Sequence, residues 1–415
     1  VESRGLGDVY KRQSLTSEAL LQAAENSSKT LRQTMNTLES SLMVLAHEAE
    51  RALMEDPPAA PKIYTAPEFD KPTLAPPDLA PYRRYQKKSE EGRFLPIVVS
   101  FDHPVFLMAP GVSEKSVISD ITRLTRIVPA LKRLSGKLGK MVFWTYVSTE
   151  NGIHISYPGH GGYPENYDPR KRPWYKAAAN DVQWTFPIVD ATTGLVIFTA
   201  SKRIQHSDRS NAGVVAMDIR ITELLQEKEL AYDWSSQMRS FLVATLDNPE
   251  ANAPGLLILA QKDYQDKQIS WSDIIEKEWL DPANSNKLRK IVLDLNDMES
   301  GYVELPYKGV DSIWAYAGIT DKVHFVVIVP KSVVMDLPDR TSRIILEYTR
   351  EQLIYTAIAA LVVVFLLTTA ALHGSRKITR TLLQIASAAK RLSGGDFSVR
   401  LDVQTGDERD QVIQA

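Results

Sequence analysis

The sequence predicts an α+β protein with one long N-terminal helix, two tandem modules built on antiparallel sheets, a membrane-crossing helix and part of a coiled coil. Three observations support this prediction. Apolar residues recur every three or four positions along residues 14–56, apolar runs of strand length form two groups within residues 94–230 and 231–338, and residues 353–372 carry no charge. Helices repeat every 3.6 residues and strands every two, so the spacing of apolar residues separates the two kinds of element.

The composition is that of a globular protein with a real core. The chain has 415 residues, of which 44% are hydrophobic and 24% charged, and its net charge is −2. Nucleic-acid binding requires a strongly basic face, so we expect no nucleic-acid partner. The chain has no cysteine, which excludes disulfides, thiolate metal sites and thiol catalysis in these residues.

The first residues do not continue any pattern found in the rest of the chain. We interpret residues 1–13 as a non-native leader, and the alternative is a native start without fixed structure. No signal peptide or first membrane helix is found there, so we expect the native N-terminus to be missing.

Residues 14–56 are predicted to form a single helix that ends before Pro57 and Pro58, since proline cannot continue a helix. Its apolar seam could pack on a second copy of the chain or on the chain's own modules. We expect a dimer contact early in the helix and packing on the chain's own modules later. The seam consists of Leu21, Ala24, Ser28, Leu31, Met35, Leu38, Leu42, Leu45, Ala49 and Ala52.

Residues 57–93 are predicted to be a proline-rich connector. Residues 57–81 contain eight prolines, which favours a stiff, extended segment over a helix or strand. A disordered loop is the alternative.

The two groups of apolar runs are predicted to be strands because of their length and β-branched residues. Few crossover helices separate them, so we expect antiparallel sheets with helices to one side. The first group lies at 94–101, 141–148, 153–157, 195–201 and 213–219, with a helix at 114–135. The second lies at 240–245, 255–260, 302–306, 312–318 and 323–330.

Residues 353–372 are predicted to cross a membrane. At 1.5 Å per residue they span about 30 Å, the thickness of a bilayer core. Residues 373–391 hold five basic residues and no acid, whereas residues 336–351 hold three basic and four acidic residues. The latter range overlaps the juxtamembrane helix that we expect at 339–352. The positive-inside rule therefore places residues up to about 350 outside the cytoplasm of a bacterial cell membrane and residues 373–415 inside it.

Residues 167–175 read Tyr-Asp-Pro-Arg-Lys-Arg-Pro-Trp-Tyr, with guanidinium and aromatic groups on a run broken by two prolines. Proline excludes a helix interior, so we expect a rigid loop. Guanidinium binds carboxylates in a bidentate fork, and aromatic faces hold cations or flat groups. The segment suits a small charged ligand; the alternative is an arginine paired with a structural aspartate beside a core tryptophan.

The order of these elements resembles the double Cache (dCache) sensor ectodomain of bacterial chemoreceptors, histidine kinases and membrane phosphatases. The resemblance rests on the long helix, the motif at 167–175, the smaller module ending in Val-His-Phe-Val-Val-Ile-Val-Pro at 323–330, and the membrane helix. It implies two PAS-like Cache modules: a membrane-distal, ligand-binding module at 94–230 and a membrane-proximal module at 231–338.

In amino-acid-binding members of that family, a tyrosine, an arginine and a tryptophan hold the ligand carboxylate, while a second tyrosine and two aspartates hold its amino group. The resemblance therefore implies a ligand site whose matching positions are Tyr167, Arg172, Trp174, Tyr175, Asp190 and Asp218.

The residue types support this assignment independently, because an amino acid needs a guanidinium for one end and carboxylates for the other. Asp190 has an alternative role, since residues 190–194 also read as a hairpin turn. The family usually has a tyrosine at the position of Ile188, so an amine, a carboxylate or another small metabolite is open as ligand. Tyr146, Tyr157 and Tyr163 are further candidates for the pocket wall, with core packing as their alternative.

Residues 373–415 resemble a truncated HAMP relay domain. Ile378, Leu382, Ile385, Ala389 and Leu392 form a coiled-coil stripe before the break at 394–397, and Asp407-Glu408 opens a second helix. Thr381 replaces the usual proline. A parallel HAMP bundle needs two chains, which implies a homodimer, and the output domain is expected to be missing.

The predicted function is extracytoplasmic sensing of a small molecule and signalling across the membrane. The seven histidines show no metal-binding spacing, and residues 159–162 lack the lysine of a phosphate loop. We therefore expect no metal, no cofactor and no catalysis in these residues. A membrane-tethered enzyme and a structural stalk without ligand are the alternatives.

Overall fold

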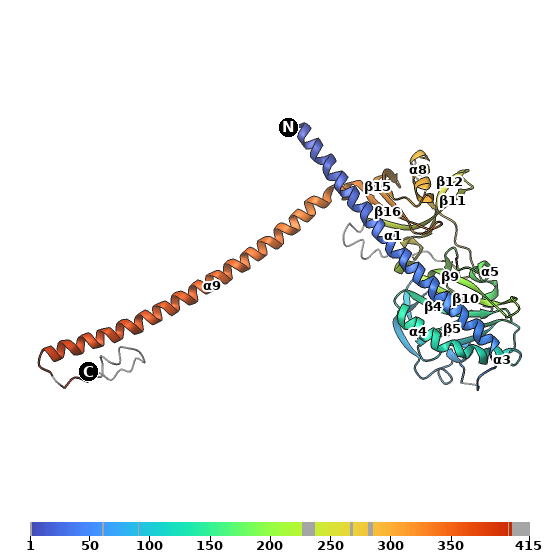
Figure 1. Ribbon diagram of the computed structural model, residues 1–415, viewed down its shortest axis with the longest axis horizontal. Helices are drawn as coiled ribbons and strands as arrows, with labels where there is room; N and C mark the ends of the chain where they lie inside the picture. Colours follow the sequence, from blue (N-terminus) through green and yellow to red (C-terminus); the bar gives the residue numbers. More distant parts are fainter. Residues whose placement is uncertain are drawn as a thin grey trace. The chain divides into compact units, whose positions relative to one another are not determined.

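The computed structural model describes residues 2–59, 62–89, 91–225, 237–265, 269–280, 285–396 and 398–400. The chain divides into two compact units, Val1–Leu337 and Pro338–Ala415. The first unit combines helices with antiparallel sheets, which confirms the predicted α+β class (Figure 1). The predicted boundary between the modules at 230/231 lies outside the described residues.

Helix α1 spans Glu2–Met54 and ends before the proline pair, as expected, but it begins well before residue 14. Figure 1 shows it running alongside both sheet modules. Near the middle of the helix, Arg32 donates to the carbonyls of Gly318 and Ile319 at 2.8 and 2.7 Å. Later in the helix, Glu39 accepts a hydrogen bond from the Trp184 indole at 2.7 Å. One helix therefore covers both modules.

Apart from Leu21, which is half-buried, the seam of α1 is buried within its own chain, so the prediction of a dimer contact early in the helix is wrong for Ala24–Leu31. Ala24, Ser28 and Leu31 are buried, and the Ser28 hydroxyl donates to the Gly318 carbonyl at 2.5 Å. The physical reason is length: at 1.5 Å per residue the helix reaches across two sheets, and each sheet needs an apolar cover.

The segment predicted as a plain connector holds regular structure, which corrects that expectation. Helix α2 (Ala66–Phe69) begins with a capping box between Thr65 and Glu68 and has Pro67 in its first turn. Strand β1 (Ala80–Lys88) pairs with β2 (Phe94–Ser100). Proline is tolerated in the first turn of a helix, where its missing N–H has no partner to lose.

The first large sheet carries the site and follows the predicted strand runs closely. Its order is β3 (Val105–Met108), β5 (Ile153–Tyr157), β4 (Val142–Thr149), β10 (Asn211–Arg220), β9 (Val196–Gln205) and β7 (Gln183–Trp184), with β8 (Ile188–Val189) also on β9. Strand β6 (Gly159–His160) instead joins β2.

The two faces of this sheet bury different sets of side chains. Val215 and Met217 of β10 belong to the main core that includes α1, whereas Trp144, Tyr146 and Ala216 belong to a second cluster. Alternate residues of a strand point to opposite faces, so Asp218 shares its face with Ala216. The face away from α1 is therefore where the site forms.

The helix predicted at 114–135 is interrupted. Helix α3 (Glu114–Leu124) passes into the 3-10 turn η1 (Thr125–Ile127), and α4 (Val128–Leu138) follows with a proline in its first turn. Proline at this place supplies no N–H for a continuous α-helical ladder, which accounts for the break.

The second large sheet has the order β13 (Trp279–Leu280), β12 (Ala253–Ala260), β11 (Arg239–Asn248), β16 (His324–Pro330), β15 (Val310–Gly318) and β14 (Gly301–Tyr307). Helix α8 (Ser285–Asn296) packs on it. Two short helical turns also lie in this part of the chain, α6 (Ile221–Leu225) and η3 (Lys262–Gln265).

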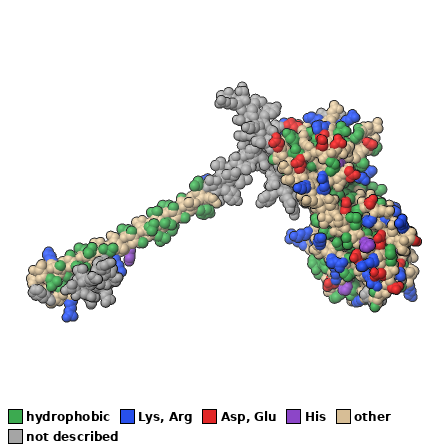
Figure 2. All heavy atoms as spheres, viewed as in Figure 1, with side chains coloured by type: hydrophobic (Ala, Val, Ile, Leu, Met, Phe, Trp, Pro, Cys, Tyr) green, Lys and Arg blue, Asp and Glu red, His purple; other side chains and the backbone are tan. Residues whose placement is uncertain are grey.

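Helix α9 spans Lys331–Ser393, so the helices expected at 339–352, 353–372 and 373 onward form one element. Its stretch Gln352–Ser393 is long and apolar enough to cross a membrane, with a mean hydropathy of 2.4 in its most apolar window. Hydrophobic side chains are exposed along this stretch (Figure 2). The helix ends at Gly394-Gly395, where Gly395 has a φ of +92°, a conformation that glycine adopts at low cost. The predicted second HAMP helix lies outside the described residues.

Candidate functional site

A narrow cavity, with an empty volume of about 340 Å³ that includes its opening to solvent, lies on the face of the first large sheet that is turned away from α1. Of the residues predicted for the ligand site, Tyr167, Arg172, Trp174, Asp190 and Asp218 line it. Tyr175 is not among the lining residues. Trp174 and Tyr175 are neighbours in helix α5 (Pro173–Ala177), and consecutive helical side chains point in different directions. Trp174 is buried against Tyr146, and Tyr175 lies beside it, outside the cavity.

The Tyr167–Tyr175 segment forms two short helical turns rather than a continuous loop. Each turn begins with a proline, Pro169 in η2 (Pro169–Lys171) and Pro173 in α5. Asp168 caps the first turn by accepting from the Arg170 N–H at 3.0 Å, and the Arg170 guanidinium binds both oxygens of the same carboxylate at 2.9 Å. The sequence left open that an arginine of this motif pairs with a structural aspartate, and Arg170 does so. Arg172 is the arginine that lines the cavity.

Arg172 stands between the two turns in extended backbone, and its side chain is only 8% exposed. Its Nη2 donates to the Val189 carbonyl at 2.8 Å, and its Nη1 donates to the Trp271 carbonyl at 2.8 Å. Within the described residues no carboxylate lies within ion-pair distance of this guanidinium. A buried cation without a paired anion is costly, so the cavity is suited to an anionic group from outside the protein.

Asp218 lies on β10, directly opposite Trp144 on β4 and Thr199 on β9. Its Oδ1 accepts hydrogen bonds from the Tyr146 hydroxyl at 2.8 Å and the Thr199 hydroxyl at 2.7 Å. Burial raises the pKa of Asp218 to about 8, Asp190 adds to the rise, and the two hydroxyl donors and Arg172 oppose it. Both hydroxyl donors reach the same oxygen, so Oδ2 is the one available to a ligand donor.

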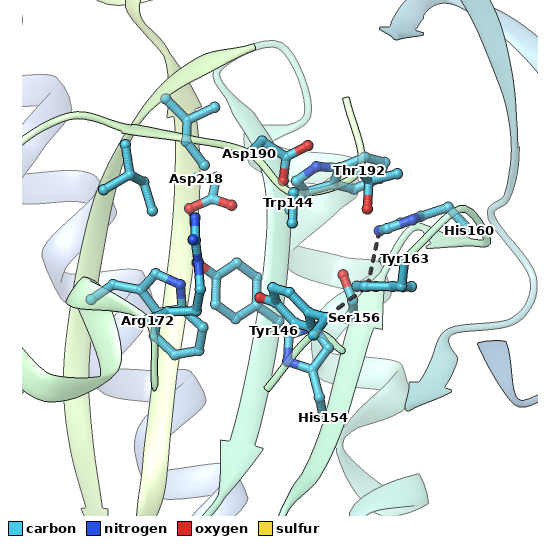
Figure 3. A pocket seen from close by; sticks show the side chains of 15 residues that line it. Trp144, Tyr146, His154, Ser156, His160, Tyr163, Arg172, Asp190, Thr192 and Asp218 are labelled. Carbon is cyan, nitrogen blue, oxygen red and sulfur yellow. Dashed lines mark hydrogen bonds between the residues drawn. The ribbon is translucent and has the colours of Figure 1, made fainter. Parts of the chain in front are cut away.

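Asp190 combines the turn role and the cavity position that the sequence left as alternatives. Its Oδ1 accepts from the Thr193 backbone N–H at 2.8 Å and from the Thr193 hydroxyl, which closes the turn to Gly194. Gly194 has a φ of +68°, which side chains of other residues rarely allow. The same aspartate lines the cavity (Figure 3).

Two histidines that the sequence analysis set aside form part of the cavity wall. His154 on β5 and His160 on β6 are joined through the hydroxyl of Tyr163, at 3.4 and 3.1 Å (Figure 3). The His160 Nδ1 lies 3.0 Å from the Gly161 carbonyl, which can only accept, so Nδ1 carries the proton and Nε2 accepts from Tyr163.

The same reasoning fixes His154. The Tyr163 oxygen is left to accept from Nε2–H of His154, and Nδ1 of His154 accepts from the Ser148 hydroxyl at 2.7 Å. Every polar atom of the two rings is used while both rings are neutral. Burial lowers the pKa of both histidines, and that of His154 falls to about 3. This wall therefore offers a ligand aromatic faces rather than charge.

The glycine-rich run beside this wall has a packing function. A Cβ on Gly159 would lie 2.2 Å from the His103 carbonyl, and a Cβ on Gly161 would lie 2.1 Å from the Asp70 carboxylate. Only glycine allows the backbone to approach this closely. The run thereby holds His160 against Trp144, with ring centroids 4.0 Å apart.

Trp144 also lines the cavity, and the sequence analysis missed it. The residue is 2% exposed, and its indole N–H has no hydrogen-bond partner in the described part of the chain. The signal that could have identified it is strand alternation, since Trp144 lies two residues from Tyr146 on β4 and faces the same way. Of the other tyrosine candidates, Tyr163 lines the cavity, whereas Tyr157 donates to the Phe101 carbonyl at 2.7 Å.

The arrangement can bind a small molecule with charges of both signs. One guanidinium and two carboxylates line a cavity whose remaining walls are mostly aromatic. Across residues 2–396, apart from the gaps given above, no group of three or more His, Asp or Glu side chains is placed to hold a metal ion.

Two family descriptions match parts of the chain. Residues 122–226 match "Methyl-accepting chemotaxis protein-like, first PDC sensor domain". Residues 374–415 match the HAMP domain. The first match contains all the predicted site residues, and the second begins soon after the apolar part of α9.

The chain is also similar to curated chemotaxis proteins. It is 25% identical to methyl-accepting chemotaxis protein McpB of Bacillus subtilis (strain 168) over 65% of this chain and 36% of that protein. It is 27% identical to McpC of the same organism over 64% of this chain and 35% of that protein. The chain therefore spans about a third of the length of these relatives.

Solved ligand-binding domains of chemoreceptors are similar at lower identity. The domain of Pseudomonas fluorescens CtaA, solved with L-isoleucine, is 14% identical with a TM-score of 0.40, over 78% of this chain and 96% of that one. The domain of Pseudomonas aeruginosa PctC, solved with GABA, is 17% identical with a TM-score of 0.39, over 76% of this chain and 99% of that one.

The described fold, the apolar helix and the two family matches agree with one another. The chain therefore carries a PDC, or Cache, sensor domain at 122–226, a helix able to cross a membrane and a HAMP domain at 374–415, and it is similar to methyl-accepting chemotaxis proteins.

Proposed function

We propose that the chain senses a small molecule with both an ammonium and a carboxylate group, an α-amino acid in the first instance. The ligand binds in the cavity of the membrane-distal module. The observation that carries the proposal is that Arg172, Asp190 and Asp218 line one cavity.

In the proposed complex, each charged end of the ligand meets a group that has no oppositely charged partner within the part of the chain that the structure describes. The Arg172 guanidinium binds the carboxylate, with Tyr167 and Trp174 beside it. The ligand ammonium donates to Asp190 and to Oδ2 of Asp218, because the positive charge favours the ionised form of Asp218 and displaces its proton. Such charge-assisted bonds are about twice as strong as neutral ones. Tyr175, the remaining residue of the predicted set, is proposed to act by packing on Trp174.

The rest of the cavity favours a ligand whose side chain is small and largely apolar. Ile188 and Ile197 line the cavity together with Trp144 and the neutral His154–Tyr163–His160 wall. An amine or a simple carboxylate contacts only one of the two charged regions. It therefore binds more weakly than an amino acid with the same side chain.

Signal transfer runs from the sensor to the HAMP domain through α9. We place residues up to about 350 outside the cytoplasm and residues 373–415 inside it. Ile378, Leu382 and Leu392 are 48%, 53% and 44% exposed in the single chain, which favours a homodimer with the stripe at its centre. In this proposal the residues present bind the ligand and relay the signal.

A binding screen tests the proposal. The full chain in lipid nanodiscs is titrated calorimetrically with the twenty proteinogenic L-amino acids and with γ-aminobutyrate, together with amines and carboxylates that carry one charge only. The proposal expects saturable binding of at least one amino acid and weaker binding of the matching amine and carboxylate. Equal binding of the three would contradict the two-charge site, and binding of none would contradict the sensor function.

A further inference from the structure

Arg172 is held by both sheet modules of the first unit. Its Nη2 is bonded to the Val189 carbonyl in the membrane-distal module. Its Nη1 is bonded to the carbonyl of Trp271, which lies between strands β12 and β13 of the second large sheet. The residue expected to bind the ligand carboxylate therefore takes part of its orientation from the other module.

The side chain of Trp271 adds a second contact. The Arg172 guanidinium carbon lies 5.4 Å from the centroid of the Trp271 ring, within the range of a cation–π interaction. The ring also lies 6.0 Å from that of Tyr167, another residue of the cavity. One tryptophan thus contacts two cavity residues from outside their own sheet.

The surface around Trp271 is hollowed and continues from the ligand cavity. A depression with an empty volume of about 1200 Å³ shares Tyr163, Asp190 and Thr192 with the cavity, and Trp271 with residues 269 and 270 lines it from the second module. Trp271 therefore lines a depression that adjoins the ligand cavity.

We propose that Trp271 is a positioning residue of the ligand site, so that the site is shared by the two modules. Its carbonyl and its indole ring orient the Arg172 guanidinium for a ligand carboxylate. A guanidinium has five N–H donors in a rigid fork; two nitrogens are anchored by carbonyls on different modules, and the remaining N–H groups stay available. This inference rests on the proposed function, because it concerns the same site.

The test replaces Trp271 and compares it with a second tryptophan of the same module. Trp279 lies on β13, packs on Gly255 and does not line the cavity. Binding of the amino acid that binds wild type most tightly in the screen above is measured for W271A, W271F and W279A in the full chain in nanodiscs. A cation–π contact contributes about 0.5–2 kcal/mol, which corresponds to roughly a 2- to 30-fold change in Kd.

We expect W271A to weaken binding by that factor, W271F to recover most of the loss, and W279A to leave Kd within about twofold of wild type even where it lowers Tm. Unchanged binding in W271A, or an equal loss in W279A, would overturn the positioning role. If wild type itself binds no amino acid of the panel, the proposed function fails, and the inference fails with it. If wild type binds and W271A binds equally well, only the inference fails.

Discussion

The hydroxyl of Tyr146 donates a hydrogen bond to Oδ1 of Asp218 at 2.8 Å, and both side chains are buried on the same face of the sheet. This contact links neighbouring strands β4 and β10 at the centre of the cavity. It stabilises the ionised form of Asp218, whereas burial and Asp190 favour the protonated form. The balance between these effects determines the charge that the cavity offers a ligand.

Replacing Tyr146 by Phe is expected to destabilise the sensor more at pH 9 than at pH 6. Hydrogen bonds between neutral groups contribute about 0.5–1.5 kcal/mol, and those to charged groups about 1.5–3 kcal/mol. Asp218, with a pKa raised to about 8, is mostly protonated at the lower pH and mostly ionised at the higher. Chemical denaturation at both values measures the difference. Tyr157→Phe, which removes a bond to a backbone carbonyl, should cost the same at both.

Asp218 gives the fold a stability that falls as pH rises. Its folded pKa of about 8 lies above its ordinary value of 3.8, so between these values the folded state binds more protons than the unfolded state. The stabilisation is complete below pH 3.8 and is lost as pH rises through about 8. Asp218→Asn should flatten the stability profile between pH 5 and 9 and weaken amino-acid binding by about tenfold or more. An unchanged slope in this variant would show that Asp218 titrates normally.

Neutral His154 contributes stability to the fold that is lost as pH falls, opposite to the effect of Asp218. Burial holds its folded pKa at about 3, below the ordinary 6.5, so the unfolded state binds the extra proton between these values. The stability contributed by neutral His154 is present above pH 6.5 and declines by up to about 1.4 kcal/mol per pH unit as pH falls. Thermal unfolding of His154→Gln between pH 4 and 7 should show a shallower decline. His206→Gln, at an exposed position, serves as the control.

Because α1 packs on the sheets, replacing a buried residue on it should lower the stability of the sensor. Leu38 is fully buried, whereas Met43 on the same helix is 49% exposed. Leu38→Ala should lower the free energy of unfolding by about 2–5 kcal/mol, because it removes apolar contact and leaves a cavity. Met43→Ala should change it by less than about 0.5 kcal/mol. Similar losses for both variants would mean that α1 does not pack on the sheets as described.

The strands could be predicted from sequence because their signals are local, whereas the charged residues of the candidate site were proposed from the resemblance to dCache domains. The runs at 153–157 and 213–219 fall on β5 and β10, since β-branched residues of strand length leave few alternatives. The connector at 57–93 was misjudged because proline content says little about pairing partners. Strand β1 is defined by its pairing with β2, which is a tertiary contact.

The rest of the site depends on contacts that a single sequence does not contain. Trp144 faces the cavity because Asp218 pairs with it in the observed register, and a shift by one residue would turn it to the other face. His154 and His160 are joined through Tyr163 although β5 and β6 belong to different sheets. Trp271 lies 99 residues from Arg172 in sequence and in the other module.

The central claim is that Arg172 binds the carboxylate of an amino acid, and one calorimetric comparison tests it most directly. Arg172→Ala is titrated with the amino acid that wild type binds, beside Lys171→Ala, which removes a neighbouring cation with an exposed side chain. The account predicts that Arg172→Ala weakens binding by about 100-fold or more, as expected for a buried charge pair, while Lys171→Ala binds like wild type. Wild-type affinity in Arg172→Ala would contradict the account.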